Sequence, residues 1–543
     1  MTALFDLAIV GSGFSGSLLA LIARRLGRSV VLLERGSHPR FAIGESSSPL
    51  ANLLLEDLAD RYGLARIRPL AAWGSWQRAY PEIGCGLKRG FTFYGHERGK
   101  PFGADRERRD QLLVAASPAD EVADTHWYRP DFDRFLANEA AAEGAEYLDR
   151  AEVSLLSSGP EGATLEASSR GETFRLRARL VVDATGPGGF LHQTLSLPAS
   201  RFPDLPDTEA LYAHFEGVRR LDALPIFPSV EAPPYPVDDA AVHHVFDGGW
   251  IWVLRFRNGL VSAGVAAERG LAGELGFADG AAAWERLLDR FPTVRAQFES
   301  ARPTIPFVHR RPMPFRAAVA SGPGWVLLPS AAAFVDPMLS TGFPLTLLGI
   351  ERLGATIRDS WNDPSFASRL DEDAAVTLFE ADAAALLVSA LYASFGDFPV
   401  FAALTTLYFA AASYAEAARR LGRPQLSGSF LSGNHPVFGP ALSACCRMAL
   451  AREPGRREEL FAAVRRAIEP FDVIGLTDPS RRNWFPVKAE DLVAGAPRLG
   501  ATELEIREVL RRCGMPAASP GPSSGSFRAD ARVSSEVQGL LGH

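Results

Sequence analysis

The sequence is poor in cysteine and carries no excess of basic charge. Four of its 543 residues are cysteine, and their spacing fits neither a disulfide framework nor a zinc site. Such usage is typical of a reduced compartment, so we expect a cytoplasmic protein. Lysine and arginine number 57 against 64 aspartate and glutamate, which gives a net charge of −7. Binding to a nucleic-acid backbone needs a basic excess, so we expect no DNA or RNA partner.

Long apolar runs are also rare. The first residues, MTALFDLAIVGSG, lack a basic start and end in a glycine loop, so we expect a buried strand there and not a signal peptide. The only membrane-like stretch that the sequence shows, 398–415, contains Pro399, Thr405, Thr406 and Ser413. We therefore expect a buried helix and no membrane partner, with a membrane span as the alternative.

A glycine fingerprint, GSGFSG at 11–16, stands between an expected strand and an expected helix. Gly11 permits a tight turn, Gly13 lets the backbone approach a pyrophosphate, and Gly16 lets the helix pack close to the strand. Glu34 ends the next expected strand and is placed to accept hydrogen bonds from ribose hydroxyls. The pattern predicts a Rossmann-type dinucleotide site at the helix N-terminus, with a glycine turn that binds no ligand as the alternative.

NAD and FAD share this fingerprint, so other segments decide between them. The relevant segments are HPRF (38–41), GESSSP (44–49), DATG (183–186), FVDP (334–337) and STG (340–342). Together they resemble the para-hydroxybenzoate-hydroxylase-like FAD proteins over roughly residues 1–360, and among these the flavin-dependent halogenases and the geranylgeranyl-reductase relatives. Many such proteins have Gly-Asp where this chain has Pro329-Ser330, but Asp336 is kept, so we expect FAD binding to be retained.

The resemblance implies FAD as the cofactor and no metal. The residues it places at FAD are Gly11, Gly13, Phe14, Ser15, Gly16, Glu34, Arg35, Gly44, Glu45, Ser46, Ser47, Arg129, Asp183, Gly186, Asp336 and Pro337. The neighbours His243 and His244 could suggest a metal, but they lack a third ligand at useful spacing, so we expect an ordinary histidine pair on a strand.

A single lysine lies in CGLKRGFTF at 85–93. The segment resembles the part of the halogenases that carries the catalytic lysine, which makes Lys88 the candidate catalytic residue. Its ammonium group would hold hypohalous acid or form a chloramine and deliver the halogen to a ring carbon, a task for which a guanidinium is unsuited. The alternative interpretation is a solvated lysine on a strand.

Two tryptophans lie in GWIWVLR at 249–255. The segment resembles the halogenase Trp-x-Trp-x-Ile-Pro motif, in which the indoles line the space near the flavin. Trp250 and Trp252 are therefore candidates for the substrate tunnel, and packing in a core is the alternative. Leu254-Arg255 replaces Ile-Pro, and this departure leaves a plain monooxygenase open.

The Ser-Thr-Gly segment resembles the halogenase loop that binds halide. By that resemblance the backbone N–H groups of Thr341 and Gly342 hold chloride or bromide, as the start of a helix can hold an anion without a metal. In tryptophan halogenases a glutamate precedes this serine, whereas here the residue is Leu339. The resemblance is therefore to the phenol-type branch, and it implies an electron-rich substrate.

The expected function is that of an FAD-dependent halogenase. It would take reduced FAD from a separate flavin reductase and use O₂ and chloride or bromide to halogenate a phenol-like aromatic, free or carrier-bound, through hypohalous acid and Lys88. The alternatives are an aromatic monooxygenase or a prenyl-chain reductase without halide chemistry, and a flavin-binding protein without activity.

The expected fold is α/β: a Rossmann-type FAD-binding domain, an interleaved antiparallel β-sheet substrate domain and a C-terminal helical region. Residues 84–94 predict one strand, and 100–125 a polar loop. The expected parts are FAD-binding segments at 1–80, 131–200 and 311–365, the Lys88 segment at 81–130, the substrate sheet at 201–310, the helical region at 366–515 and a disordered tail at 516–543.

Overall fold

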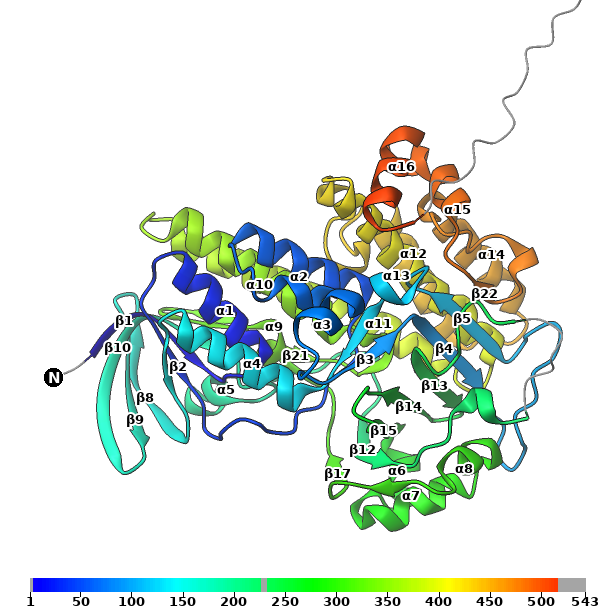
Figure 1. Ribbon diagram of the computed structural model, residues 1–543, viewed down its shortest axis with the longest axis horizontal. Coiled ribbons are helices and arrows are strands. Elements are labelled where there is room, and N and C mark those ends of the chain that lie inside the picture. The colour runs from blue at the N-terminus through cyan, green and yellow to red at the C-terminus, as the bar shows by residue number, and fades with distance from the viewer. Residues whose placement is uncertain (1–2, 226–231, 516–543) are drawn as a thin grey trace, which may run out of the picture.

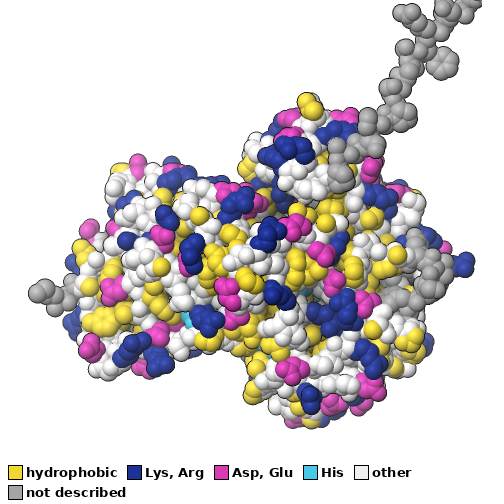
Figure 2. Space-filling model, in the orientation of Figure 1, with side chains coloured by type: hydrophobic (Ala, Val, Ile, Leu, Met, Phe, Trp, Pro, Cys, Tyr) yellow, Lys and Arg dark blue, Asp and Glu magenta, His cyan; other side chains and the backbone are white. Residues whose placement is uncertain are grey.

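The computed structural model describes residues 3–225 and 232–515, so the expected tail at 516–543 lies outside the described residues. The described residues form two large sheets and two small ones of three and two strands, and most of the C-terminal helices lie beside the second large sheet (Figure 1). The α/β class and the Rossmann-type architecture are confirmed. The boundaries of the expected parts stay predictions. On the face shown in Figure 2, acidic and basic side chains are interspersed.

The first sheet has the nucleotide-binding topology. Its main path runs β19 (Ser321–Gly322), β20 (Trp325–Leu327), β10 (Glu172–Asp183), β1 (Ala3–Val10), β2 (Val30–Leu33) and β7 (Glu146–Leu148), and a hairpin of β8 (Ala151–Gly159) and β9 (Gly162–Ser169) extends β10. From β20 to β7 the strands are parallel. β1 pairs with β2 on one side and with β10 on the other, so the strand order reverses beside β1. Parallel sheets bind ligands at such a topological switch point.

Three helices position the loops at this edge of the sheet. They are α1 (Phe14–Arg25), α4 (Arg129–Ala142) and α10 (Gly342–Ser360). The strands β1 and β2 are buried through Leu7–Val10 and Val30–Leu33. Continuous apolar runs of this kind belong to parallel strands that are covered on both faces.

The second sheet has nine strands and is largely antiparallel. Its path is β16 (Arg302–Pro303), β12 (Thr208–Glu216), β15 (Val261–Glu268), β14 (Gly249–Arg255), β13 (Ala241–Phe246), β4 (Gly90–Gly95), β5 (Gln111–Ala115) and β22 (Trp484–Phe485), with β17 (Val308–Arg310) beside β12. In β14, Trp250, Trp252 and Leu254 face one core and Ile251 and Val253 the other.

Two expectations for the segment around Lys88 are wrong. Residues 84–94 are not one strand, because the chain breaks at Arg89 into β3 (Cys85–Lys88) and β4, and β3 pairs with β6 (Asp124–Trp127) in a separate two-stranded sheet. The break is sharp at Gly90, where a Cβ atom would lie 2.4 Å from the carbonyl oxygen of Val114. Residues 100–125 are not only a loop, since they contain β5 and the start of β6.

The C-terminal region is mostly helical, as expected, but it also supplies β22 to the second sheet. Its helices are α11 (Phe366–Ala393), α12 (Phe398–Arg420), α13 (Phe438–Ala451), α14 (Arg457–Ile468), α15 (Ala489–Ala494) and α16 (Glu503–Arg512). Both α11 and α12 are long and apolar enough to cross a membrane, so the expectation of a single such stretch is wrong. Their most apolar windows are 61% and 67% buried inside the protein, as in the core helices of soluble proteins.

Candidate active site

Two of the three glycines in the turn after β1 are required by the fold, whereas the third, Gly13, lines a cavity. Gly11 has a φ of +103°, and a Cβ atom on Gly16 would lie 1.9 Å from the carbonyl oxygen of Gly11, so the fold itself requires both. At Gly13 the nearest protein atom to a Cβ would be 3.5 Å away, and its φ of −65° suits any residue. The space beside Gly13 therefore fits a pyrophosphate at the start of α1.

Glu34 lies at the end of β2, as expected. Its carboxylate accepts hydrogen bonds from the backbone N–H of Ser12 (3.0 Å) and of Gly36 (2.9 Å). Burial opposes the charge, but the Arg40 guanidinium and these hydrogen bonds keep the pKa of Glu34 below its usual value. An ionised carboxylate here fits the ribose hydroxyls of a dinucleotide. The neighbouring Arg35 is exposed and lies outside the cavity, whereas Arg40, which we did not predict, lines it.

A cavity of about 410 Å³ opens at this edge of the sheet. Most of the predicted residues line it: Gly13, Phe14, Ser15, Gly44, Glu45, Ser46, Arg129, Gly186, Trp250, Trp252, Asp336, Pro337, Thr341 and Gly342. Ser47 and Asp183 are buried beside it without lining it. The Asp183 carboxylate accepts hydrogen bonds from the backbone N–H groups of Thr185 (2.8 Å) and Leu191 (2.7 Å), so it shapes the turn after β10.

Two charged side chains brace the cavity wall. Arg129 binds Asp133 through two hydrogen bonds of 2.7 Å and donates a third, of 2.9 Å, to the carbonyl oxygen of Gly44. It thereby fixes the 44–49 segment against α4. Asp336 accepts from the backbone N–H of Met338 (2.9 Å) and from the Tyr392 hydroxyl (2.8 Å), and burial raises the pKa of Asp336 to about 7. Both residues therefore hold the backbone of the site in place.

The Ser-Thr-Gly loop has the geometry of an anion site. Leu339 and Ser340 have φ values of +61° and +55°, and α10 begins directly afterwards at Gly342. The first N–H groups of a helix have no partner within it, and a left-handed turn beside them makes a concave surface of N–H groups. A Cβ atom on Gly342 would meet no protein atom within 4 Å, and Thr341 and Gly342 both line the cavity, so an anion has room beside this loop.

Lys88 is fully buried, which overturns the interpretation of a solvated strand lysine. Its Nζ donates hydrogen bonds to the Ser46 hydroxyl (2.9 Å), the Ser47 carbonyl oxygen and, at 3.4 Å, the Ser340 hydroxyl. It also lies 3.7 Å from the centre of the Phe91 ring. Burial lowers the pKa of Lys88, and the nearby Asp124 partly offsets this. The lysine thus joins the cofactor cavity to the predicted halide loop.

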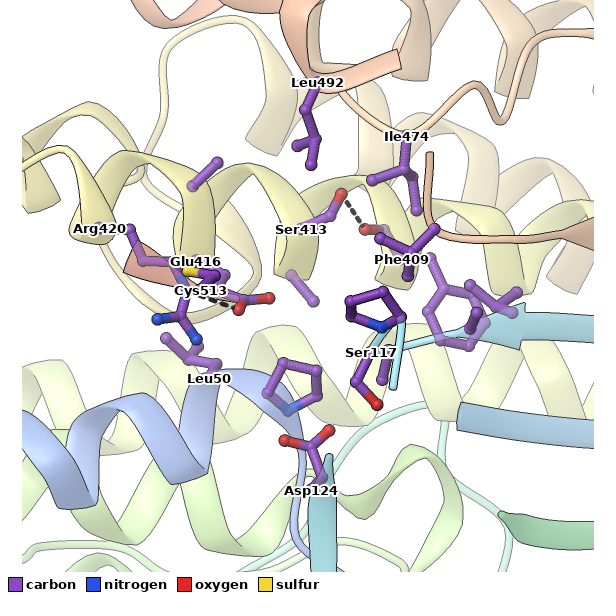
Figure 3. A pocket seen from close by; sticks show the side chains of 18 of the residues that line it. Leu50, Ser117, Asp124, Phe409, Ser413, Glu416, Arg420, Ile474, Leu492 and Cys513 are labelled. Carbon is purple, nitrogen blue, oxygen red and sulfur yellow. Dashed lines mark hydrogen bonds and ion pairs between the residues drawn. The ribbon is translucent and has the colours of Figure 1, made fainter. Parts of the chain in front are cut away.

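A second, smaller cavity of about 160 Å³ lies on the other side of Lys88. Phe91 and Asp124 line this cavity, whereas Ser46 and Ser340 line the large one. Figure 3 shows the smaller cavity between the start of α2 (Pro49–Arg61), α12 and the C-terminal helices. Lys88 therefore lies in the wall between the two cavities.

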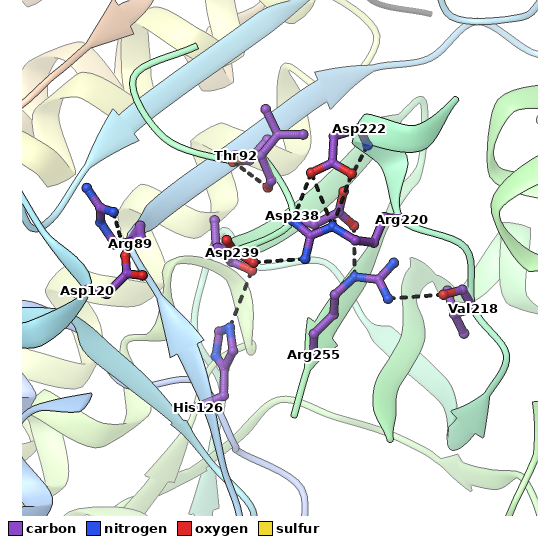
Figure 4. Close-up of polar contacts among 12 residues, drawn as sticks. Arg89, Thr92, Asp120, His126, Val218, Arg220, Asp222, Asp238, Asp239 and Arg255 are labelled. Carbon is purple, nitrogen blue, oxygen red and sulfur yellow. Dashed lines mark hydrogen bonds and ion pairs between the residues drawn. The ribbon is translucent and has the colours of Figure 1, made fainter. Parts of the chain in front are cut away.

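Of the two residues that replace the Ile-Pro pair of the halogenase motif, Leu254 lies at the site and Arg255 lies outside it. Leu254 lines the large cavity, but Arg255 points to the opposite face of β14 (Figure 4). Its guanidinium donates to Asp238 Oδ1 (2.8 Å) and to the carbonyl oxygens of Val218 (3.0 Å) and Arg219 (2.6 Å). Asp238 is 1% exposed. The arginine therefore stabilises the end of β14 through these hydrogen bonds.

We expect Arg255→Ala to destabilise the protein while leaving FAD affinity unchanged. The substitution leaves the buried Asp238 carboxylate without its cation, a loss of about 3–5 kcal/mol in the free energy of unfolding. Urea denaturation and FAD titration measure the two effects, and the matched control is Arg257→Ala, whose side chain is exposed. Loss of FAD binding at unchanged stability would place Arg255 at the cofactor instead.

The histidine pair has ordinary partners. His243 lies 3.2 Å from the carbonyl oxygen of Thr92 through Nδ1, and His244 lies 3.1 Å from the Gln297 side chain through Nε2. Over residues 3–225 and 232–515, no three His, Cys, Asp or Glu side chains come close enough to hold a metal ion.

Several known proteins resemble this chain. Monodechloroaminopyrrolnitrin halogenase PrnC of Pseudomonas fluorescens is 29% identical over 74% of this chain and 70% of its own length. Tetracycline 7-halogenase of Kitasatospora aureofaciens is 29% identical over 67% of this chain and 65% of its own length. The crystal structure of halogenase PltM in complex with phloroglucinol and FAD matches with a TM-score of 0.78 at 23% identity, over 88% of this chain and 99% of that one.

The model of the FAD dependent oxidoreductase family matches residues 6–335. That range contains the glycine turn, Glu34 and Asp183, and the cavity beside Gly13 and the ionised Glu34 fit the diphosphate and ribose of FAD. FAD is therefore the cofactor. Because the match covers more than half of the chain, this protein belongs to the FAD dependent oxidoreductase family.

Proposed function

We propose that this protein is an FAD-dependent halogenase that uses reduced FAD, O₂ and chloride or bromide to halogenate an electron-rich, phenol-like aromatic. The observation that carries the proposal is the position of Lys88 between the cofactor cavity and a second cavity. Its buried ammonium contacts the 44–49 segment of the cofactor cavity and Ser340 of the halide loop, and a second cavity lies beyond it. The halogenases that the chain resembles support the proposal.

Each part of the chain has a separate task in this reaction. FAD, when bound and reduced, supplies the electrons that activate O₂. The glycine turn and Glu34 bind its ADP half, and the N–H groups of Thr341 and Gly342 hold the halide. Trp250 and Trp252 line the cavity and exclude water from it. Lys88 then holds hypohalous acid through a hydrogen bond and directs its halogen to the ring.

The reduced FAD comes from a separate reductase, because the sequence has only one glycine fingerprint after a strand and FAD occupies it. The aromatic is either free or held on a carrier protein. One similar protein, from Pseudoalteromonas luteoviolacea, is a 1H-pyrrole-2-carbonyl-[peptidyl-carrier protein] brominase, which shows that carrier-bound acceptors occur among the relatives. We place the protein in the cytoplasm, since its four cysteines are all free thiols.

The test is incubation with a flavin reductase, NADH, bromide and a panel of phenols, followed by mass spectrometry. We expect the bromine isotope doublet in a product mass, dependent on bromide and on the reductase. Without the reductase the protein should oxidise NADH only slowly. A hydroxylated ring that forms without halide, or fast NADH oxidation by the protein alone, would instead establish a monooxygenase.

A further inference from the structure

Asp124 has a buried carboxylate, and one of its oxygens has no hydrogen-bond partner among the described residues. It begins β6 and pairs directly with Lys88 of β3, so the two side chains lie on the same face of the ladder. Asp124 is 6% exposed. Its Oδ1 accepts a hydrogen bond from Asn52 Nδ2 (3.2 Å), but its Oδ2, among the described residues, has no hydrogen-bond partner. A buried acceptor left unsatisfied costs free energy, which a ligand donor would recover.

The carboxylate faces the smaller cavity. Figure 3 shows Asp124 pointing towards the side chains that line it. The rest of that wall near Lys88 is largely apolar and aromatic, with Phe91, Tyr408 and Phe409 arranged edge to face around it. Such a wall fits a flat aromatic ring. A ring seated there would lie against Phe91 and Asp124, which are both neighbours of Lys88.

We propose that Asp124 is a catalytic residue whose Oδ2 accepts a hydrogen bond from a ring O–H or N–H of the substrate and takes that proton during halogen transfer. This inference rests on the proposed function and narrows its substrate class. The substrate that receives the halogen is a phenol or an aromatic amine with a free O–H or N–H on the ring, because a methylated oxygen has no hydrogen to donate to Asp124. Tryptophan halogenases have a glutamate at the position of Leu339, next to the halide loop. This chain has no carboxylate there, and we assign that part to Asp124 on β6.

With a phenol as substrate, hypohalous acid supplies the halogen, and Lys88 and Asp124 move the protons. A pair of ring electrons forms the carbon–halogen bond, the halogen–oxygen bond of hypohalous acid breaks, and the departing hydroxide leaves as water with a proton from Lys88. The hydroxyl proton of the phenol passes to Asp124, which leaves a ring ketone. The ring C–H proton then returns to Lys88, and the Asp124 proton returns to the ketone oxygen. The products are the halogenated phenol and water, and both residues regain their charges.

The surroundings of Asp124 suit this role. Burial raises the pKa of Asp124, and Lys88, Arg420 and the Asn52 hydrogen bond lower it, while Glu416 raises it further. A carboxylate of raised pKa is a stronger base, as proton transfer from a phenol requires. The amide of Asn52 holds Oδ1, so Oδ2 is the oxygen left for the substrate.

The decisive variant is Asp124→Asn. Because Asn52 donates to Oδ1, the new amide should turn its NH₂ group towards the cavity and offer a donor where the substrate needs an acceptor. We expect the halogenation rate of phenols to fall about 100-fold or more, as for the loss of a general base. FAD affinity and Tm should remain near those of the wild type. The matched control is Asp373→Asn, which should keep the wild-type rate because its carboxylate lies outside both cavities and accepts a hydrogen bond from the Thr356 hydroxyl at 2.8 Å.

Binding gives a second measurement that needs no halide. Calorimetric titration of the FAD-loaded protein should show phloroglucinol binding about 10-fold or more tightly than its trimethyl ether, and Asp124→Asn should remove that preference. If the wild type halogenates phenols and Asp124→Asn matches it in rate and preference, Asp124 has no catalytic role. If the wild type halogenates no compound, the proposed function fails, and the binding preference alone then decides whether Asp124 recognises the donor.

Discussion

Replacing Lys88 with alanine should abolish halogenation while FAD binding and O₂ consumption continue. The glycine turn and Glu34 bind the ADP half of FAD, whereas Lys88 lies in the wall between the two cavities. Without the ammonium group no positioned donor remains for hypohalous acid, and we expect the halogenated product to fall about 100-fold or more. Product mass spectrometry and an oxygen electrode measure the two activities separately.

The lysine comparison has a natural control. Lys100 forms an ion pair with Glu97 on the surface, and Lys100→Ala should leave both activities unchanged. Lys88→Met keeps most of the buried stem without the charge and should behave like Lys88→Ala, which separates chemistry from packing. Lys88→Arg should also be inactive, because a guanidinium does not give up its proton and has different geometry. Normal halogenation by Lys88→Ala would show that the mechanism proposed for this protein is wrong.

Valine at position 13 should prevent FAD binding without unfolding the protein. The backbone at Gly13 has φ −65°, and its Cβ would make ordinary contacts at 3.5–3.7 Å with the ends of Arg40, Arg129 and Asp133. The branched side chain would therefore fit the protein but occupy the space that the pyrophosphate needs. We expect FAD affinity to fall about 100-fold or more, measured by flavin absorbance that stays with the protein in gel filtration.

The partner variant is Gly16→Val, three residues along the same turn. Its Cβ would lie 1.9 Å from the carbonyl oxygen of Gly11, so the strand and the helix must separate. We expect this variant to lose stability as well as FAD, whereas Gly13→Val keeps the Tm of the FAD-free protein. Normal FAD affinity in Gly13→Val would remove the glycine turn from the cofactor site.

The features that the sequence predicted well depend on residues close together in the chain. The strand, glycine turn and helix at 3–25 follow from local apolar pattern and glycine spacing, and so does Glu34 at the end of β2. The contact between Lys88 and Ser340 joins residues 252 positions apart, so no local pattern contains it. The burial of Lys88 likewise follows from the pairing of β3 with β6 and from the segments that cover them.

Asp124 and Arg255 were missed for different reasons. Asp124 stands in a segment that looked like a polar loop, because the short apolar run of β5 is surrounded by charged residues. Arg255 occupies a position of the halogenase motif, and for that reason its presence left a plain monooxygenase open. The alternation of a strand already places Trp250, Trp252 and Leu254 on one face and position 255 on the other. The sequence alone therefore predicts that Arg255 points away from the face that carries Trp250 and Trp252.

The order of the chain has a consequence for how the protein is made. The described residues that line the cofactor cavity end at Ala381, whereas the smaller cavity also needs Ile474, Leu492 and Leu510. The strand β22, which pairs with β5 at the edge of the second sheet, is also a late segment. During synthesis, the lining of the cofactor cavity is therefore complete more than one hundred residues before the lining of the smaller cavity. We therefore expect that a ribosome-bound chain binds FAD before it can bind an aromatic ring in the smaller cavity.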